Sequence, residues 1–370
     1  DGTAIGGGGG SFELIDENRT GTYAYTAPSA TGDNAIAIGN GATASGLNLS
    51  TAIGYNATAS NSSAMALMGT ASGSQSTSMG HLSSASAGQS MALGMQTSAG
   101  AASSVALGRY ATTATNDYAM ALGRSYASGL HSLAAAISTN SSSYGATGAY
   151  SIALGYQSKA EDNNAIALNG GRADGSGALA WSTSARARFS RSIALGYNAY
   201  ANADNAIAIG TNALSDVKGK VVFSNFTIAP TYSQGSAQSG QYTLGCQTSD
   251  ATATTMTSDN SATANSLNQV KLHDHEAVAF EILLVGRQDG TDGSDCAAWK
   301  IMGLIKRASG AANTTLVNSS TTVIDNTPSW GTPALSADTT NGCLKVQVTG
   351  AASTDIAWVA TVTTSELTHS

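Results

Sequence analysis

The segment Asn34-Ala-Ile-Ala-Ile-Gly39 returns almost unchanged as Asn205-Ala-Ile-Ala-Ile-Gly210, and varied copies of the same motif fill the sequence between them. The copies close at positions 39, 54, 69, 80, 94, 108, 123, 138, 155, 169, 182, 196 and 210. Most steps between these positions are 14 or 15 residues long. A motif repeated at this near-constant step indicates a stack of short structural repeats.

Each copy of the motif has two halves. The first half alternates large and small residues, as in Ile36-Ala37-Ile38, and a period of two is typical of a β-strand. The second half carries small residues, as in Ala42-Thr43-Ala44. Two short strands and two tight turns fit in one copy, so we predict one coil of a β-solenoid per copy. The Gly that closes the first strand is expected to adopt a positive φ.

A helical interpretation does not suit these repeats. Gly, Ser, Thr and Asn recur throughout, and each of them disfavours a helix interior. No Pro occurs between Pro28 and Pro230, as expected if every coil donates backbone N–H groups to the next coil. The sequence therefore predicts strands.

The balance of side-chain sizes predicts association between chains. We expect each coil to bury about two large aliphatic side chains, worth roughly 1.5–3 kcal/mol each. Ordering about 14 residues costs about 1–2 kcal/mol apiece, so further contacts are required. We expect the small alternating residues to form the face on which neighbouring chains pack. These residues are Ala37, Ala92, Ala106, Ala121, Ala153, Ala194 and Ala208.

The repeat pattern also resembles a known family. Ser-Val/Ile-Ala-Ile/Leu-Gly followed by Ala-x-Ala-x-Gly/Ser is similar to the YadA-like head repeats of trimeric autotransporter adhesins, and the resemblance covers residues 33–216. It implies a left-handed parallel β-roll and a homotrimer. The short step to Gly80, the long step to Gly155 and the Gly170-Gly171 pair depart from the pattern, and we expect tightened or bulged turns there.

A different domain follows the repeats. We interpret residues 217–240 as a connector and residues 241–370 as an antiparallel β-sandwich of jelly-roll type, because strand-like segments alternate with Asp-Gly and Asn-Gly turn signals. The predicted strands are 241–248, 276–287, 296–307, 314–324, 343–349 and 355–363. The predicted core residues are Phe280, Ile282, Leu284, Trp299, Ile301, Leu304, Trp330 and Trp358.

The C-terminal domain carries a second resemblance. It is similar to a domain found in structural fibres of cyanophages and other marine phages, on the evidence of segments 238–244, 297–307, 344–350 and 356–366. The resemblance implies a tail fibre or other virion appendage, assembled in the host cytoplasm. The N-terminal segment 1–32, with its glycine run, would then join the fibre to other virion proteins.

The composition argues against several classes of protein. The chain has 370 residues, a net charge of −7 and 11% charged residues, whereas nucleic-acid-binding proteins usually present a basic face. No apolar run approaches the ~20 residues of a membrane-spanning helix, so no membrane insertion is expected. Cys246, Cys296 and Cys343 cannot all pair with one another within one chain. We expect them to be mostly free and buried, in a protein made in a reducing compartment.

Few residues suggest a catalytic or metal-binding site. His273-Asp274-His275 is compatible with a metal site or with a polar turn, and we favour the turn because consecutive strand residues point to opposite faces. Asp289, Asp292 and Asp295 are compatible with calcium binding or with a hairpin loop, and we favour the loop. No positioned pair of carboxylates is apparent. We therefore predict no catalytic site, no cofactor and no metal.

Exposed Tyr and Arg side chains are the better candidates for recognition, since they stack on sugars or meet anionic groups. Tyr55, Tyr156 and Tyr197 each follow a closing Gly, as do two arginines, Arg109 and Arg124. Arg186, Arg188 and Arg191 lie within one coil and would form a basic collar in a trimer. For both groups we nevertheless favour the interpretation as ordinary solvated surface. The loops of the terminal domain are a further candidate, because loops on rigid scaffolds often carry recognition.

Taken together, the sequence predicts a structural fibre or spike of a phage virion that contacts a host-surface glycan or protein receptor through multivalent binding. One alternative is a fragment of a bacterial trimeric surface adhesin. Another is a non-adhesive spacer or capsid decoration.

Overall fold

The computed structural model describes residues 12–14, 26–136, 143–226, 233–289 and 295–369. Strands and turns make up nearly all of these residues, and the helix found among them is a single 3₁₀ turn, η1 (Ala311–Asn313). The predicted all-β class is confirmed. The chain divides into two compact units, Asp1–Ala173 and Asp174–Ser370. Much of the predicted N-terminal junction, residues 1–11 and 15–25, lies outside the described residues.

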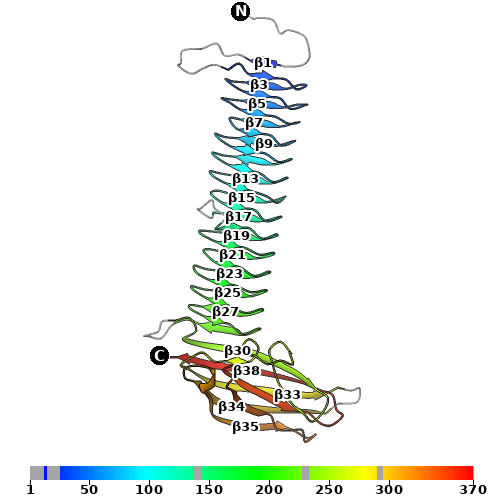
Figure 1. The fold of residues 1–370 in the computed structure, drawn as a ribbon, viewed down its shortest axis with the longest axis vertical. Coiled ribbons are helices and arrows are strands. Elements are labelled where there is room, and N and C mark those ends of the chain that lie inside the picture. Colours follow the sequence, from blue (N-terminus) through cyan, green and yellow to red (C-terminus); the bar gives the residue numbers. More distant parts are fainter. Residues whose placement is uncertain (1–11, 15–25, 137–142, 227–232, 290–294, 370) are drawn as a thin grey trace, which may run out of the picture. The chain divides into compact units, whose positions relative to one another are not determined.

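The first unit is a parallel β-solenoid whose coils each contribute one strand to each of two sheets (Figure 1). The strands of the first sheet are β1 (Phe12–Leu14), β3 (Ile36–Ile38), β5 (Thr51–Ile53), β7 (Met65–Leu67), β9 (Thr77–Met79), β11 (Met91–Leu93), β13 (Val105–Leu107), β15 (Met120–Leu122), β17 (Leu133–Ala135), β19 (Ile152–Leu154) and β21 (Ile166–Leu168). Those of the second sheet are β2 (Ser29–Ala30), β4 (Thr43–Ala44), β6 (Thr58–Ala59), β8 (Thr70–Ala71), β10 (Ser84–Ala85), β12 (Ser98–Ala99), β14 (Thr112–Thr113), β16 (Tyr126–Ala127), β18 (Gly145–Ala146), β20 (Lys159–Ala160) and β22 (Arg172–Ala173). Equivalent residues of successive coils align in register, so Ala92 lies beside Ala106 and Ala106 beside Ala121.

Small residues fill the interior of each coil. In one coil the side chains of Ser104, Ala106, Ala111 and Thr113 are all fully buried. The two hydroxyls hydrogen-bond each other at 2.8 Å, and Ser104 Oγ also donates to the carbonyl of Ala101 at 2.7 Å. The interior is therefore a stack of methyl and hydroxyl groups rather than a core of large aliphatic side chains.

This arrangement corrects one prediction. The alternating alanines, including Ala37 and Ala153, line the interior of a single chain instead of facing a neighbour. The reason is the shortness of the turns, which cannot hold the two sheets at the roughly 10 Å of ordinary face-to-face sheets. Only Cβ-sized groups fit between them, so the large residues of the same strands point outward.

The outward residues of the first sheet form what we call the apolar stripe. In the first unit it comprises Ile36, Ile38, Ile53, Met65, Leu67, Met79, Met91, Leu93, Val105, Leu107, Met120, Leu122, Leu133, Ile152, Leu154, Ile166 and Leu168. Its members are partly or largely exposed, for example Met65 at 44% and Leu107 at 45%. The second sheet instead turns hydroxyl residues outward in seven successive coils, at Ser29, Thr43, Thr58, Thr70, Ser84, Ser98 and Thr112. The roll is amphipathic.

The closing glycines adopt positive φ, as predicted, with the exception of Gly69. Gly94 has φ +128°, and a Cβ built on it would lie 2.4 Å from the carbonyl oxygen of Gly108 in the next coil. Both the backbone conformation and the stacking therefore require Gly at this position. The short step to Gly80 corresponds to a tightened turn, since β8 begins only three residues after β7 ends. Part of the long step before Gly155, residues 137–142, lies outside the described residues.

The second unit begins with further coils and ends with a head domain (Figure 1). The coil strands are β23 (Leu179–Trp181), β24 (Arg186–Ala187), β25 (Ile193–Leu195), β26 (Tyr200–Ala201), β27 (Ile207–Gly210), β28 (Leu214–Ser215) and β29 (Val221–Ser224). The head contains β30 (Ala237–Thr248), β31 (Ala253–Thr255), β32 (Val270–Lys271), β33 (Glu276–Gln288), β34 (Cys296–Arg307), β35 (Thr314–Asp325), β36 (Ala334–Asp338), β37 (Cys343–Thr349) and β38 (Ile356–Thr368). Each predicted head strand corresponds closely to one of these.

The head consists of two antiparallel sheets packed face to face, as the sequence predicts. The larger sheet has the order β29-β30-β38-β33-β34-β35, and in the smaller sheet β37 pairs with β31, β32 and β36. Trp299, Trp330 and Trp358 form the centre of the core, and the ring centroids of Trp299 and Trp330 lie 5.9 and 5.5 Å from that of Trp358. Strand β29, within the predicted connector, extends the roll by pairing with β27 and joins the head by pairing with β30.

Two details of the head differ from expectation. Leu304, predicted to lie in the core, is 39% exposed because it points to the opposite face of β34 from Trp299 and Ile301. Cys246 and Cys343 are buried and free, as expected, whereas Cys296 is free but exposed at the start of β34. Burial raises the pKa of the Cys246 thiol to about 11, which keeps that group protonated near neutral pH.

We predict that Gly94→Ala lowers the free energy of unfolding by at least about 2 kcal/mol, because it adds backbone strain and a clash with the next coil. Gly88→Ala is the matched control, since a Cβ there meets its nearest atom only at 3.8 Å. It should change stability by no more than about 0.5 kcal/mol. Thermal and denaturant unfolding of both variants measures the difference, and equal stabilities would contradict the stacking account.

Candidate functional site

The tyrosines predicted to contact a receptor are exposed, but they do not form one site. Tyr55 and Tyr156 are 63% and 59% exposed in the first unit, on coils separated by several others. Tyr197, in the second unit, is 57% exposed. A different cluster occurs on two successive coils, where the guanidinium groups of Arg109 and Arg124 lie 4.7 and 5.5 Å from the ring of Tyr110.

The three collar arginines lie on neighbouring positions of the second unit, and each has a partner one coil away. Arg186 forms an ion pair with Asp174 at 2.9 Å. The side chains of Arg188 and Arg191 donate hydrogen bonds to asparagine side chains, at 3.0 and 2.8 Å. These contacts orient the arginines along the roll. The Asp174 pair offsets part of their positive charge, so the surface is less basic than the sequence alone indicates.

The first unit also contains an aromatic stack that was not predicted from the sequence. The rings of Tyr118, His131 and Tyr150 lie nearly parallel, with centroids 4.7 and 5.2 Å apart. All three residues have positive φ at the same turn of successive coils. The signal in the sequence is that each directly precedes the small buried residue that starts a coil. Because the faces of His131 are covered, this stack mainly strengthens coil stacking.

The head contains a hollow of about 720 Å³ at the ends of β30, β33 and β38. Gln247, Arg287 and Ala357 lie side by side across the sheet there, with Asp289 and Asp355 at the strand ends. Amide, guanidinium and carboxylate groups together can hydrogen-bond a polar ligand such as a sugar. The predicted calcium loop adjoins this place, but Asp292 lies outside the described residues.

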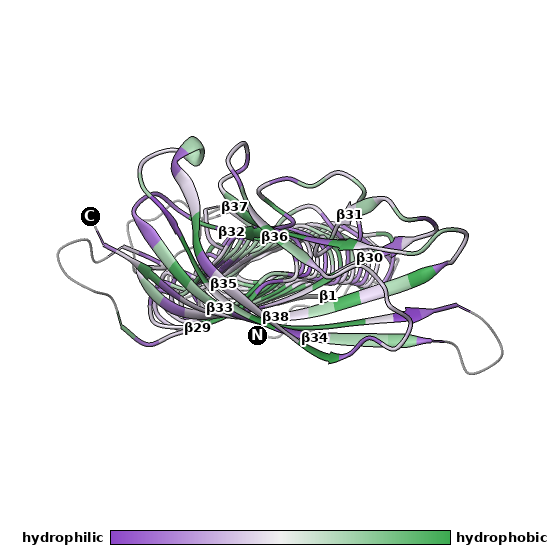
Figure 2. Ribbon diagram, turned by 90° about the horizontal axis from the view of Figure 1, so that it is seen from below, coloured by the Kyte–Doolittle hydropathy of each residue, from purple (hydrophilic) through white to green (hydrophobic). Residues whose placement is uncertain are grey.

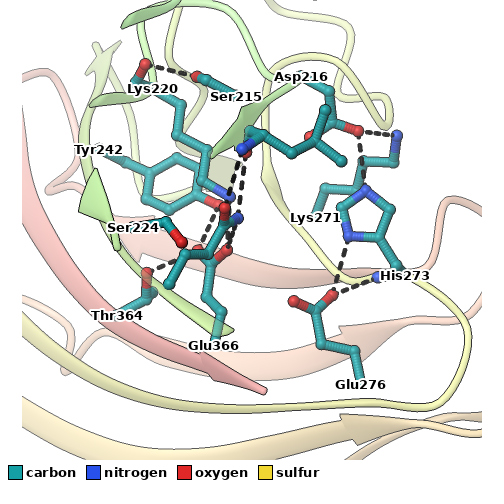
Figure 3. A network of polar contacts seen from close by, with 12 residues as sticks. Ser215, Asp216, Lys220, Ser224, Tyr242, Lys271, His273, Glu276, Thr364 and Glu366 are labelled. Carbon is teal, nitrogen blue, oxygen red and sulfur yellow. Dashed lines mark hydrogen bonds and ion pairs between the residues drawn. The ribbon is translucent and has the colours of Figure 1, made fainter. Parts of the chain in front are cut away.

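Charged residues gather where the last coil meets the head, and Glu366 is the centre of the first group (Figure 3). Its carboxylate forms an ion pair with Lys220 at 2.8 Å, with both side chains 1% exposed. It also accepts hydrogen bonds from Gln238, Tyr242 and Thr364 at 2.6, 3.3 and 2.7 Å. Lys220 belongs to the last coil, whereas its partners come from β30 and β38.

His273 is the centre of the second group (Figure 3). One ring nitrogen lies 2.9 Å from a carboxylate oxygen of Asp216, and the other lies 3.1 Å from one of Glu276. Lys271 also forms an ion pair with Asp216. Asp216 directly follows the coil strand β28, so this group too links the roll to the head. The predicted polar turn at His273 is therefore part of a buried electrostatic joint.

The protonation states follow from burial and partners. Burial alone would lower the pKa of His273, but its hydrogen bonds to Asp216 and Glu276 raise it to about 9. Burial likewise opposes the charge on Lys220, yet the nearby carboxylates raise its pKa. Burial would raise the pKa of Glu366, and the charge of Lys220 instead holds it below its usual value. Both ends of the joint are thus charged at neutral pH.

This joint holds two structural elements together rather than presenting a reactive group to solvent. Lys220 and Glu366 are inaccessible, and among the described residues no group of three or more His, Cys, Asp or Glu side chains is placed to hold a metal. In the part of the chain that the structure describes, no helix is long and apolar enough to cross a membrane.

Comparison with known protein families identifies repeats within the roll. The profile of the YadA head domain repeat matches residues 30–48, 49–67, 71–97, 89–111, 146–168 and 190–213. This chain contains YadA head repeats. The matched segments lie within the coils described above. A search of curated proteins found no significant match. The matched segments end before the head, so the resemblance of that domain to phage fibres stays a prediction.

We predict that Lys220→Met destabilises the protein by about 3–5 kcal/mol, because it leaves the carboxylate of Glu366 buried and unpaired. Lys218→Met is the control two residues away. Its ion pair with Asp259 is partly exposed, and its loss should leave the stability close to that of wild type. The double variant Lys220→Met/Glu366→Gln should recover part of the lost stability. Equal effects of the two single variants would show that the joint is unimportant.

The raised pKa of His273 predicts a pH dependence of stability. Its folded pKa of about 9 exceeds its ordinary value of 6.5, so its contribution is fully present below pH 6.5. It is lost as the pH rises through 9, and amounts to at most about 3 kcal/mol per chain. Unfolding of wild type and His273→Gln between pH 6 and 10 measures this. The variant should show a flatter profile, and His275→Asn on the same loop should resemble wild type.

Proposed function

We propose that this chain is the subunit of a trimeric, non-enzymatic attachment fibre. The roll supplies a stiff stem, and the head supplies the surface that contacts a target cell. YadA head repeats suggest an adhesin-type fibre, and such repeats typically form homotrimers. The proposed trimer therefore rests on the repeat family together with the exposure of the apolar stripe.

The apolar stripe is the observation that carries this proposal. In a single chain, Met and Leu side chains remain 36–45% exposed in coil after coil, as at Met79, Met120 and Leu154. Soluble monomers rarely expose contiguous apolar surface of this extent. The hydroxyl residues of the other sheet can hydrogen-bond to solvent and need no protein partner. Neighbouring chains would therefore pack on the stripe alone. In this proposal the chains contact one another through the aliphatic residues, and the alanines stay inside each roll.

Attachment through three identical heads raises avidity without new contacts, because the second and third binding events become intramolecular. The hollow beside Arg287 and Asp355 supplies polar groups for a host-surface glycan or protein receptor. The collar arginines and the exposed tyrosines are a second candidate surface, with Arg188 and Arg191 the most exposed of the collar.

We place this fibre on a phage virion, as the resemblance of the head domain implies. A bacterial trimeric surface adhesin is an equally possible assignment, and the YadA head repeats are the observation that favours it. Labelled antibody against the head distinguishes them by electron microscopy, since it would decorate either purified phage particles or the surface of uninfected cells.

We predict that Leu107→Glu weakens attachment to target cells by at least about tenfold, because a charge in the stripe separates the chains and removes avidity. Thr112→Glu on the hydroxyl face is the control and should bind like wild type. Binding of fluorescently labelled protein to cells measures this, with circular dichroism to verify that each variant keeps its β-structure. Full binding by a dissociated, folded Leu107→Glu variant would contradict a multivalent mechanism.

A further inference from the structure

A second apolar surface lies on the head, on the outer face of its larger sheet. Leu283, Val285, Met302 and Val359 are 46–55% exposed there, although each belongs to the middle of a long strand. Val285 lies directly beside Val359, and Met302 beside Glu281. Figure 2 shows both hydrophobic and hydrophilic stretches along the strands of the head. In β33 the apolar run Ile282-Leu283-Leu284-Val285 supplies both faces of the sheet, because Ile282 and Leu284 are buried in the core whereas Leu283 and Val285 are exposed. We call the exposed apolar surface formed by Leu283, Val285, Met302 and Val359 the head patch.

The charges within the head patch do not oppose its burial. Glu281 and Lys300 form an ion pair at 3.0 Å on this face. The pair lies among the aliphatic side chains, since Glu281 is beside Met302 and Lys300 is beside Leu283. Because each charge already has its partner, neither needs one from another molecule. The exposed aliphatic side chains around it are of the kind that protein interfaces bury.

The head patch and the roll stripe share one hydrogen-bonded sheet within the second unit. Strand β29 pairs with β27 on one side and with β30 on the other, and β38, β33 and β34 follow in order. The face is continuous as well. In the second unit the apolar stripe consists of the corresponding outward residues Leu179, Trp181, Ile193, Leu195, Ile207, Ile209, Val221 and Phe223. Phe223 lies beside Ser239, which lies beside Ser365 of β38, and all three side chains point away from the core.

The head is also held firmly to the last coil. The Lys220–Glu366 pair is buried between them, and Val217 of the coil belongs to the hydrophobic core of the head. A second chain whose stripe packs in parallel and in register against Leu195 and Ile209 therefore brings its own head to the same level. The surface that it meets there is the head patch.

We infer that the head patch is an interface with the head of a second copy of this chain. The inference rests on the proposed fibre, in which the stripes associate, and it extends that association beyond the repeats into a domain that the repeat profile does not cover. The head faces would then be buried, so a receptor would be contacted through strand ends and loops rather than through the flat face of the sheet.

Cysteine crosslinking tests this inference in the full chain. Cys296→Ser removes the exposed native thiol, and Val285→Cys, Leu195→Cys and Ala253→Cys are each introduced into that background. Leu195 reports on the stripe, whereas Ala253 is exposed on the smaller sheet of the head. Each protein is treated at low micromolar concentration with a short bis-maleimide and analysed on denaturing gels. Circular dichroism and the fluorescence of the buried tryptophans verify folding.

We expect chain-linked products from Val285→Cys and Leu195→Cys, with at least about tenfold less from Ala253→Cys. Products from Leu195→Cys without products from Val285→Cys would overturn the head interface and leave the fibre intact. Products from neither would overturn both proposals. Equal products from Val285→Cys and Ala253→Cys would show random collision and also overturn the interface.

Discussion

The closeness of the two sheets in each coil determines the rest of the structure. Turns of a few residues hold the sheets so near each other that residues such as Ala106 and Ser104 fill the space completely. The interior of the roll therefore buries little apolar surface per residue, and the backbone ladder between coils bears much of the stability. The aliphatic residues that would form a core elsewhere, such as Leu107, must point outward. An exposed apolar stripe thus follows from the same geometry that makes the coil.

The head differs from the roll in having a core of large side chains. It has a conventional core around Trp299 and Trp358, and it closes the end of the last coil through buried charges instead of through a large apolar contact. Lys220 of the last coil pairs with Glu366 of the head, and Asp216, which follows the coil strand β28, pairs with His273 of the head. Buried pairs of this kind add little net stability, yet they penalise any other arrangement severely, because a misplaced partner leaves a charge unpaired. The joint therefore fixes the orientation of the head on the last coil.

Periodic features could be predicted from the sequence, and features that depend on distant residues could not. The strands, the positive φ of the closing glycines and the two-sheet head all follow from local patterns, and the strand predicted at 276–287 corresponds to Glu276–Gln288. The side of the strand that faces inward was assigned wrongly, because alternation shows that two faces differ but not how far apart the sheets lie. The Lys220–Glu366 pair joins residues 146 positions apart, and no local pattern indicates it. The receptor-contact residues stay predictions.

Sedimentation equilibrium of the purified chain tests the central claim most directly, since the proposed fibre requires the aliphatic exteriors of the chains to associate. We predict one species with three times the 36.8 kDa mass of a single chain, stable on dilution to low micromolar concentration. A folded, β-rich species of 36.8 kDa that remains soluble with its stripe exposed would contradict the account.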